Sequence, residues 1–134
     1  MIQPLRILVA DDDAEMTHYY GRIIPHLGHV FLAAVGNGLE LVESCQTLRP
    51  SLVISDIRMP ELDGISAMES VQDRACIPFI FVTAENQTDH LPRLKRGHVL
   101  GYLQKPVRRT ELVSSLETAS GYLRMAPSTC VAGA

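Results

Sequence analysis

The sequence predicts an α/β fold, a doubly wound five-stranded parallel sheet of (βα)5 form, and two observations carry this prediction. Five short runs rich in apolar and β-branched residues alternate with segments in which apolar residues recur at helical spacing. The polar residues best suited to chemistry follow the ends of these runs, where ligands bind in parallel sheets. Helices on both faces are expected to bury the strands.

The first and third of these runs both end on acidic residues. The run at 6–10 is followed by Asp11, Asp12 and Asp13, and the run at 52–55 is followed by Asp56. If the two strands are neighbours, their carboxylates meet and repel one another by about 4 kcal/mol per close pair at an effective dielectric near 20. A divalent cation such as Mg²⁺ would neutralise them and leave positions for phosphate oxygens. The pattern predicts a phosphoryl site with Asp56 as the nucleophile.

The other elements follow in chain order. Asp13 is expected to cap a helix that reaches Gly28, with Pro25 kinking or shortening its last turn. Pro92 predicts that the helix after the fourth strand begins near His90, with the proline in its first turn, or is distorted. The remaining predictions are strands at 29–35, 77–82 and 99–104, a turn at 36–38, and helices at 39–48, 65–71 and 112–123.

Length and composition indicate a single globular domain. The chain has 134 residues, of which 46% are hydrophobic and 20% charged, and its net charge is −3. No basic stripe suggests direct nucleic-acid binding, and no apolar run or signal-peptide pattern suggests a membrane, so a cytoplasmic protein is expected. Domain bounds are predicted at 1–125, with 126–134 as a flexible tail or the start of a linker. The three widely spaced cysteines predict free thiols.

Four groups of residues occur together in this order. They are Ile7 to Asp12, Ser55 to Pro60 with Asp63-Gly64, Val82 to Ala84, and Tyr102 to Pro106. In combination they resemble the receiver domain of two-component response regulators, over roughly residues 5 to 124. The resemblance implies the flavodoxin-like fold with strand order 2-1-3-4-5. It also implies a phosphorylation-activated signalling domain, rather than an enzyme acting on other substrates.

The resemblance also assigns a metal site and a phosphoacceptor. Asp12 and Asp56 would bind Mg²⁺ directly, together with the backbone carbonyl of Arg58, and Asp11 would act through a metal-bound water. Asp56 would accept the phosphoryl group from a sensor histidine kinase or a phosphotransfer protein. The output would pass to a downstream output domain or protein, and a phosphorylation-dependent homodimer is possible in this family.

Three further residues are implied in the switch. Lys105 would pair with the Asp56 carboxylate and then with a phosphoryl oxygen. Thr83 would move its hydroxyl towards the phosphoryl group, and Tyr102 would turn inward in the active state. No metal-ligand pattern is found among the five histidines, which are interpreted as structural or surface residues.

Two charged residues modify this pattern. Arg58 and Glu85 each lie two positions after a motif residue, at places that vary across the family and flank the phosphoryl group. We hypothesise that their opposite charges meet over the mouth of the site, where they would hinder the hydrolytic water and slow loss of phosphate.

Two other functions fit parts of the sequence. A metal-dependent phosphatase would use Asp11 and Asp13 as an Asp-x-Asp pair, with Asp11 as nucleophile, but this leaves Asp56 and Lys105 without necessary roles. A flavin-binding module of similar topology would require a phosphate loop rich in glycine and hydroxyl groups after the first strand, where this chain has three acids. No output domain fits after residue 124, so the chain is expected to be a stand-alone receiver or part of a longer regulator or hybrid kinase.

Overall fold

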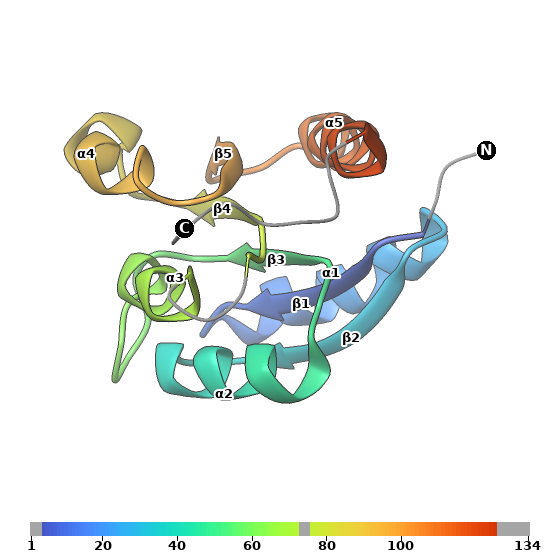
Figure 1. Ribbon diagram of the computed structural model, residues 1–134. Helices are drawn as coiled ribbons and strands as arrows, with labels where there is room; N and C mark the ends of the chain where they lie inside the picture. The colour runs from blue at the N-terminus through green and yellow to red at the C-terminus, as the bar shows by residue number, and fades with distance from the viewer. Residues whose placement is uncertain (1–3, 73–75, 126–134) are drawn as a thin grey trace.

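The computed structural model describes residues 4–72 and 76–125, so the predicted tail at 126–134 lies outside the described part of the chain. Its elements alternate along the chain (Figure 1). They are β1 (Arg6–Ala10), α1 (Ala14–His26), β2 (Val30–Val35), α2 (Gly38–Leu48), β3 (Leu52–Ser55), α3 (Gly64–Gln72), β4 (Phe79–Thr83), the 3₁₀ helix η1 (Gln87–His90), α4 (Leu91–Leu94), β5 (Val99–Gln104) and α5 (Arg109–Met125).

All five strands form one parallel sheet in the order β2-β1-β3-β4-β5, as predicted. The chain moves outward from β1 to β2, then crosses back to β3 and continues to β5. This reversal places β1 and β3 side by side in the centre of the sheet. The carboxyl ends of parallel strands share one edge, so the residues after β1, β3, β4 and β5 are brought together there.

Helices cover both faces of the sheet and divide the core into two layers (Figure 1). α2, α3 and α4 pack on one face, and α1 and α5 pack on the other. Buried residues of the first layer include Leu41, Val53, Met68, Phe79 and Leu94. Those of the second layer include Ile24, Leu52, Ile54, Ile80 and Leu116. β3 and β4 are buried along their whole length, which explains their nearly continuous apolar sequences.

Several predicted bounds differ from the structure at their ends. β4 begins at Phe79 rather than at residue 77, because Pro78 has no N–H to donate to the strand ladder. β2 begins at Val30, since the N–H of the preceding His29 donates back to the carbonyl of Ile24 in α1. α1 includes Pro25 and ends one residue later, at His26.

The helix containing Pro92 is short, and its start is as predicted. α4 begins at Leu91, directly after His90, and Pro92 lies in its first turn. Proline is tolerated there because the first turn of a helix has no intrahelical acceptor for its N–H groups. No helix in residues 4–72 or 76–125 has the length and apolar character needed to span a membrane.

The cysteines differ from one another. Cys45 is buried and free, as predicted. Cys76 is disulfide-bonded, so the prediction of a free thiol is wrong at that position. Spacing along the chain does not show which side chains the fold brings within bonding distance. Cys130 lies outside the described residues.

Close packing of α3 against the end of β3 requires a glycine at the start of the helix. The N–H of Gly64 donates to the carbonyl oxygen of Ile57 at 2.8 Å. A methyl group at Gly64 would collide with the carbonyl oxygen of Asp56 and would lie 2.9 Å from Ser55 Oγ. The first turn of α3 thus rests directly on the backbone of Asp56.

We expect Gly64→Ala to lower the free energy of unfolding by about 1–3 kcal/mol, because the added methyl group displaces α3 from the Asp56 backbone. The matched control is Gly121→Ala in α5, where an added Cβ has no neighbour within 4 Å. Alanine has the higher helix propensity, so this control should gain about 0.5–1 kcal/mol. Urea unfolding followed by circular dichroism measures both. Equal effects of the two substitutions would contradict the proposed packing of Gly64.

His29 makes stability depend on pH. Burial lowers the pKa of His29 below its ordinary value, and its Nδ1 accepts a hydrogen bond from the Leu5 N–H at 3.0 Å. On acidification the unfolded chain takes up a proton near pH 6.5, whereas the folded protein takes it up only at lower pH. The free energy of unfolding should therefore decrease as the pH falls between these two pKa values.

We expect His29→Asn, which retains an acceptor oxygen but cannot titrate in this range, to flatten the decrease of stability between pH 7 and pH 5. Urea unfolding at a series of pH values provides the measurement. The exposed His18 of α1 supplies the control substitution His18→Asn, which should keep the wild-type slope. A wild-type slope in His29→Asn would show that His29 does not contribute to the pH dependence.

Candidate functional site

Three carboxylates meet at the carboxyl ends of β1 and β3. Ala10 pairs with Ser55 in the sheet, so the next residues, Asp11 and Asp56, leave the strands side by side. The N–H of Asp56 donates to the Ala10 carbonyl at 2.8 Å, which extends this alignment. One carboxylate oxygen from each of Asp11, Asp12 and Asp56 lies within 4.8 Å of the other two. Asp11 and Asp56 are buried, whereas Asp12 is exposed.

Lys105 joins the two buried acids. Its Nζ donates to Asp11 Oδ2 and to Asp56 Oδ2, each at 2.9 Å. Its backbone N–H donates to the carbonyl of Thr83 at 2.8 Å, so β4 positions the lysine as it leaves β5. Burial opposes the charge of Lys105, but the hydrogen bonds to the two aspartates outweigh it and raise the pKa of the ammonium group. Lys105 is therefore cationic at neutral pH.

Positive charge from one lysine does not balance this cluster. Burial raises the pKa of Asp11, and this effect exceeds the opposing contributions of the Asp13 N–H and of Lys105. One ammonium group binds the two buried carboxylates, and Asp12 adds a third carboxylate to the cluster. The oxygen donors, their separation and the remaining negative charge fit a hard divalent cation such as Mg²⁺, with the exposed Asp12 on the solvent side.

The backbone fixes the orientation of Asp56. Its Oδ1 accepts hydrogen bonds from the N–H groups of Ile57 at 2.6 Å and Arg58 at 3.3 Å, while Oδ2 is bound by Lys105. The hydroxyl of Ser55, which is fully buried, donates to the carbonyl of Asp56 at 2.7 Å. Protein groups therefore hold both carboxylate oxygens and the main chain of Asp56.

Thr83 and Tyr102, the two residues expected to switch, both contact Glu85. Thr83 ends β4 and is buried, and its Oγ1 accepts a hydrogen bond from the Glu85 N–H at 3.3 Å. Tyr102 in β5 is half-buried, and its hydroxyl donates to the Glu85 carbonyl at 2.7 Å. Burial, followed by the nearby charge of Glu85, raises the pKa of Tyr102 to about 12, so the hydroxyl keeps its proton at neutral pH.

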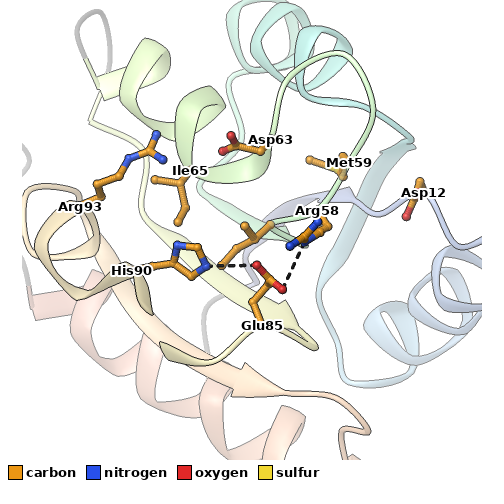
Figure 2. A pocket seen from close by; sticks show the side chains of 9 residues that line it. Asp12, Arg58, Met59, Asp63, Ile65, Glu85, His90 and Arg93 are labelled. Atoms are coloured by element: carbon orange, nitrogen blue, oxygen red, sulfur yellow. Dashed lines mark hydrogen bonds and ion pairs between the residues drawn. The ribbon is translucent and has the colours of Figure 1, made fainter. Parts of the chain in front are cut away.

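Arg58 and Glu85 do meet beside the site, as hypothesised. Arg58 Nε lies 3.2 Å from Glu85 Oε2, and His90 Nε2 donates to Glu85 Oε1 at 3.3 Å. Figure 2 shows Glu85 between these two partners, at one side of a cavity of about 470 Å³ that also includes Asp12 and Arg93. The Arg58 side chain is 79% exposed, so this pair lies at the solvent boundary.

Sequence reasoning placed Asp13 correctly but missed the contact of His90. Asp13 is the N-cap of α1 and accepts a hydrogen bond from the Glu15 N–H at 2.9 Å. The sequence predicts only a structural or surface role for His90, but its ring binds Glu85. The available sequence signal was its position five residues after Glu85 and two residues before Pro92, which indicates the start of a helix but no partner.

Comparison with known proteins agrees with this architecture. Residues 7–117 match the family model of the response regulator receiver domain. The transcriptional regulatory protein PdtaR of Mycobacterium tuberculosis is 31% identical over 121 residues, which cover 90% of this chain and 59% of the relative. The positive alginate biosynthesis regulatory protein of Pseudomonas aeruginosa is 31% identical over 119 residues, covering 87% and 47%. The chain thus spans less than two thirds of either relative.

Solved structures show the same fold. The response regulator domain of CheB from Thermotoga maritima superposes with a TM-score of 0.79 at 26% identity, covering 93% of this chain and all of that one. The signal receiver domain of a modulated diguanylate cyclase from Desulfovibrio desulfuricans G20 gives a TM-score of 0.77 at 29% identity, covering 91% and 98%. With the match over residues 7–117, these similarities show that the chain belongs to the response regulator receiver domain family.

Proposed function

We propose that this protein is a phosphorylation-activated switch of a two-component phosphorelay, with Asp56 as the phosphoacceptor. The observation that carries the proposal is the Asp56 carboxylate, which backbone N–H groups hold at Oδ1 and Lys105 holds at Oδ2, beside Asp11 and Asp12. A sensor histidine kinase or a phosphotransfer protein would donate the phosphoryl group, and the transfer would take place in the cytoplasm.

Mg²⁺ would be held by Asp12, Asp56 and the backbone carbonyl of Arg58, with Asp11 acting through a bound water. When bound, the ion would shield the charge on the phosphoryl oxygens. An Asp56 carboxylate oxygen attacks phosphorus and forms the O–P bond. The bond between phosphorus and the donor histidine nitrogen breaks, and that nitrogen retains the electron pair. Lys105 pairs with a phosphoryl oxygen, which stabilises the transferred charge.

The switch would begin at Thr83. Its hydroxyl now accepts the Glu85 N–H, and in the phosphorylated state it would donate to a phosphoryl oxygen instead. Tyr102 would then adopt the inward position that favours the active surface. The added charge is local, and it shifts the equilibrium between two packing arrangements of the same domain.

The output would pass through protein contacts to a downstream output domain or protein, and a phosphorylation-dependent homodimer is one form it could take. The relatives are longer than the matched region, so their remaining parts are where regulators of this kind would place an output. The domain would act as a signalling module that catalyses only its own phosphorylation and dephosphorylation. No direct binding of nucleic acid or membrane is proposed.

The phosphatase alternative has less support. It needs Asp13 beside Asp11 in the metal site, but the Asp13 side chain caps α1. Among the described residues, the group of acids suited to a metal consists of Asp11, Asp12 and Asp56. The second acid of the Asp-x-Asp pair is therefore directed to helix capping.

We expect incubation with Mg²⁺ and acetyl phosphate to add one phosphoryl group to the wild-type protein, measured as intact mass. Asp56→Asn removes the nucleophile and should abolish the gain, as should chelation of Mg²⁺. Asp13→Asn is the matched control, because asparagine caps a helix about as well as aspartate, and it should be phosphorylated like wild type.

The same set of variants separates the two functions. Phosphorylation that survives in Asp56→Asn but is lost in Asp11→Asn would favour the metal-dependent phosphatase, with Asp11 as its nucleophile. If wild type gains no mass and also fails to bind beryllofluoride, the protein would be a degenerate receiver that works by binding alone.

We expect Arg58→Ala to speed loss of phosphate from phosphorylated Asp56 by a factor of up to about 5, because an exposed ion pair contributes about 0.2–1 kcal/mol. Glu85→Ala should act in the same direction, and the double substitution should add little to either change. Phosphoryl loss is followed by intact mass after removal of the donor. Arg22→Ala, at an exposed arginine of α1, is the control. An unchanged or longer lifetime in Arg58→Ala would remove the idea that this pair hinders hydrolysis.

A further inference from the structure

We propose that His90 is a positioning residue that transmits the state of the phosphoacceptor site to the η1–α4 segment, residues 87–94, through Glu85. This inference rests on the proposed function and specifies how its signal leaves the site.

Glu85 is bound at every polar atom that it offers. Its N–H donates to Thr83 Oγ1, and its carbonyl accepts from the Tyr102 hydroxyl. Its carboxylate contacts Arg58 with Oε2 and His90 with Oε1. Both residues expected to switch therefore hold the backbone of Glu85, while its side chain connects the β3–α3 loop with the start of α4 (Figure 2).

The His90 side chain has no role in capping the helix that it precedes. His90 is the N-cap residue of α4, a position where a side chain often binds a backbone N–H, but it makes no such bond. Its ring is directed to Glu85 instead, and the two side chains are 20% and 27% exposed. At this degree of burial, solvent screens the contact less than it screens the Arg58 contact.

The two ends of the η1–α4 segment are anchored differently. At its far end, Arg93 donates to both carboxylate oxygens of Glu69 in α3, at 3.1 and 2.7 Å, and to Ser66 Oγ at 3.0 Å. Leu94 is buried in the core of that layer. At its near end, His90 ties the segment to Glu85. A displacement at Glu85 should therefore move the near end while α3 holds the far end.

The sequence of events follows from these contacts. When Thr83 turns its hydroxyl to a phosphoryl oxygen, the Glu85 N–H loses its acceptor. The Glu85 backbone then relaxes together with Tyr102, and its carboxylate moves relative to His90. Because α4 comprises only four residues, it has few internal hydrogen bonds to resist this movement.

The test is amide hydrogen exchange of residues 87–94 in the whole protein, with Mg²⁺ alone and with Mg²⁺ and beryllofluoride, which mimics the phosphoryl group. We expect beryllofluoride to change exchange in wild type. His90→Ala should exchange about fivefold faster before the addition, as expected for loss of one hydrogen bond, and should respond little to it. His90→Gln, whose amide can donate to Glu85, should restore most of the response.

Two controls separate coupling from general loosening. His26→Ala, at the exposed end of α1, should respond like wild type. In a Glu85→Ala background, His90→Ala should cause no further change. A full wild-type response in His90→Ala, or no rescue by His90→Gln, would overturn the inference.

Failure of the underlying function gives a different result. Intact mass after acetyl phosphate reports acceptance of the phosphoryl group in each variant. A wild type that neither gains a phosphoryl group nor binds beryllofluoride overturns the proposed function. Loss of phosphorylation only in His90→Ala overturns the inference. It would show that His90 is needed for Asp56 to accept the phosphoryl group, and not for transmitting the signal to α4.

Discussion

The candidate site depends on one ammonium group held between two buried carboxylates. Lys105 extends from the end of β5 to Asp11 after β1 and Asp56 after β3. Burying two carboxylates together is unfavourable unless a cation compensates them. The lysine supplies part of that compensation, and the charge that remains is what fits the cluster to a divalent cation. This interaction needs three strands to end at the same edge, which the parallel sheet provides.

Packing of the layers then fixes the geometry of the acceptor. α3 begins with Gly64 against the Asp56 carbonyl, and Ser55, inside the sheet, donates to the same oxygen. The main chain of Asp56 is therefore part of the core, although its carboxylate faces the site. This arrangement preorganises the carboxylate, and it also makes the acceptor sensitive to any change in how α3 packs.

Glu85 links this rigid edge to the more weakly supported side of the fold. α4 is a single turn, anchored at its far end by Arg93 on α3 and by the buried Leu94, and at its near end by His90 on Glu85. Segments that move in signalling come from the least stable parts of a structure. The near end of this short helix has this character, because its polar contact to Glu85 contributes little and can be exchanged for another.

By itself, the sequence determined the fold class, the strands and the placement of the acids, because apolar periodicity and strand ends are local properties of the chain. It also determined where the helix after His90 begins, since proline restricts the start of a helix. Only the tertiary structure decided that Lys105 bridges two acids and that His90 binds Glu85. It also decided the bonded state of Cys76. Tertiary packing sets the distances between the side chains that make these contacts, and local sequence patterns do not determine those distances.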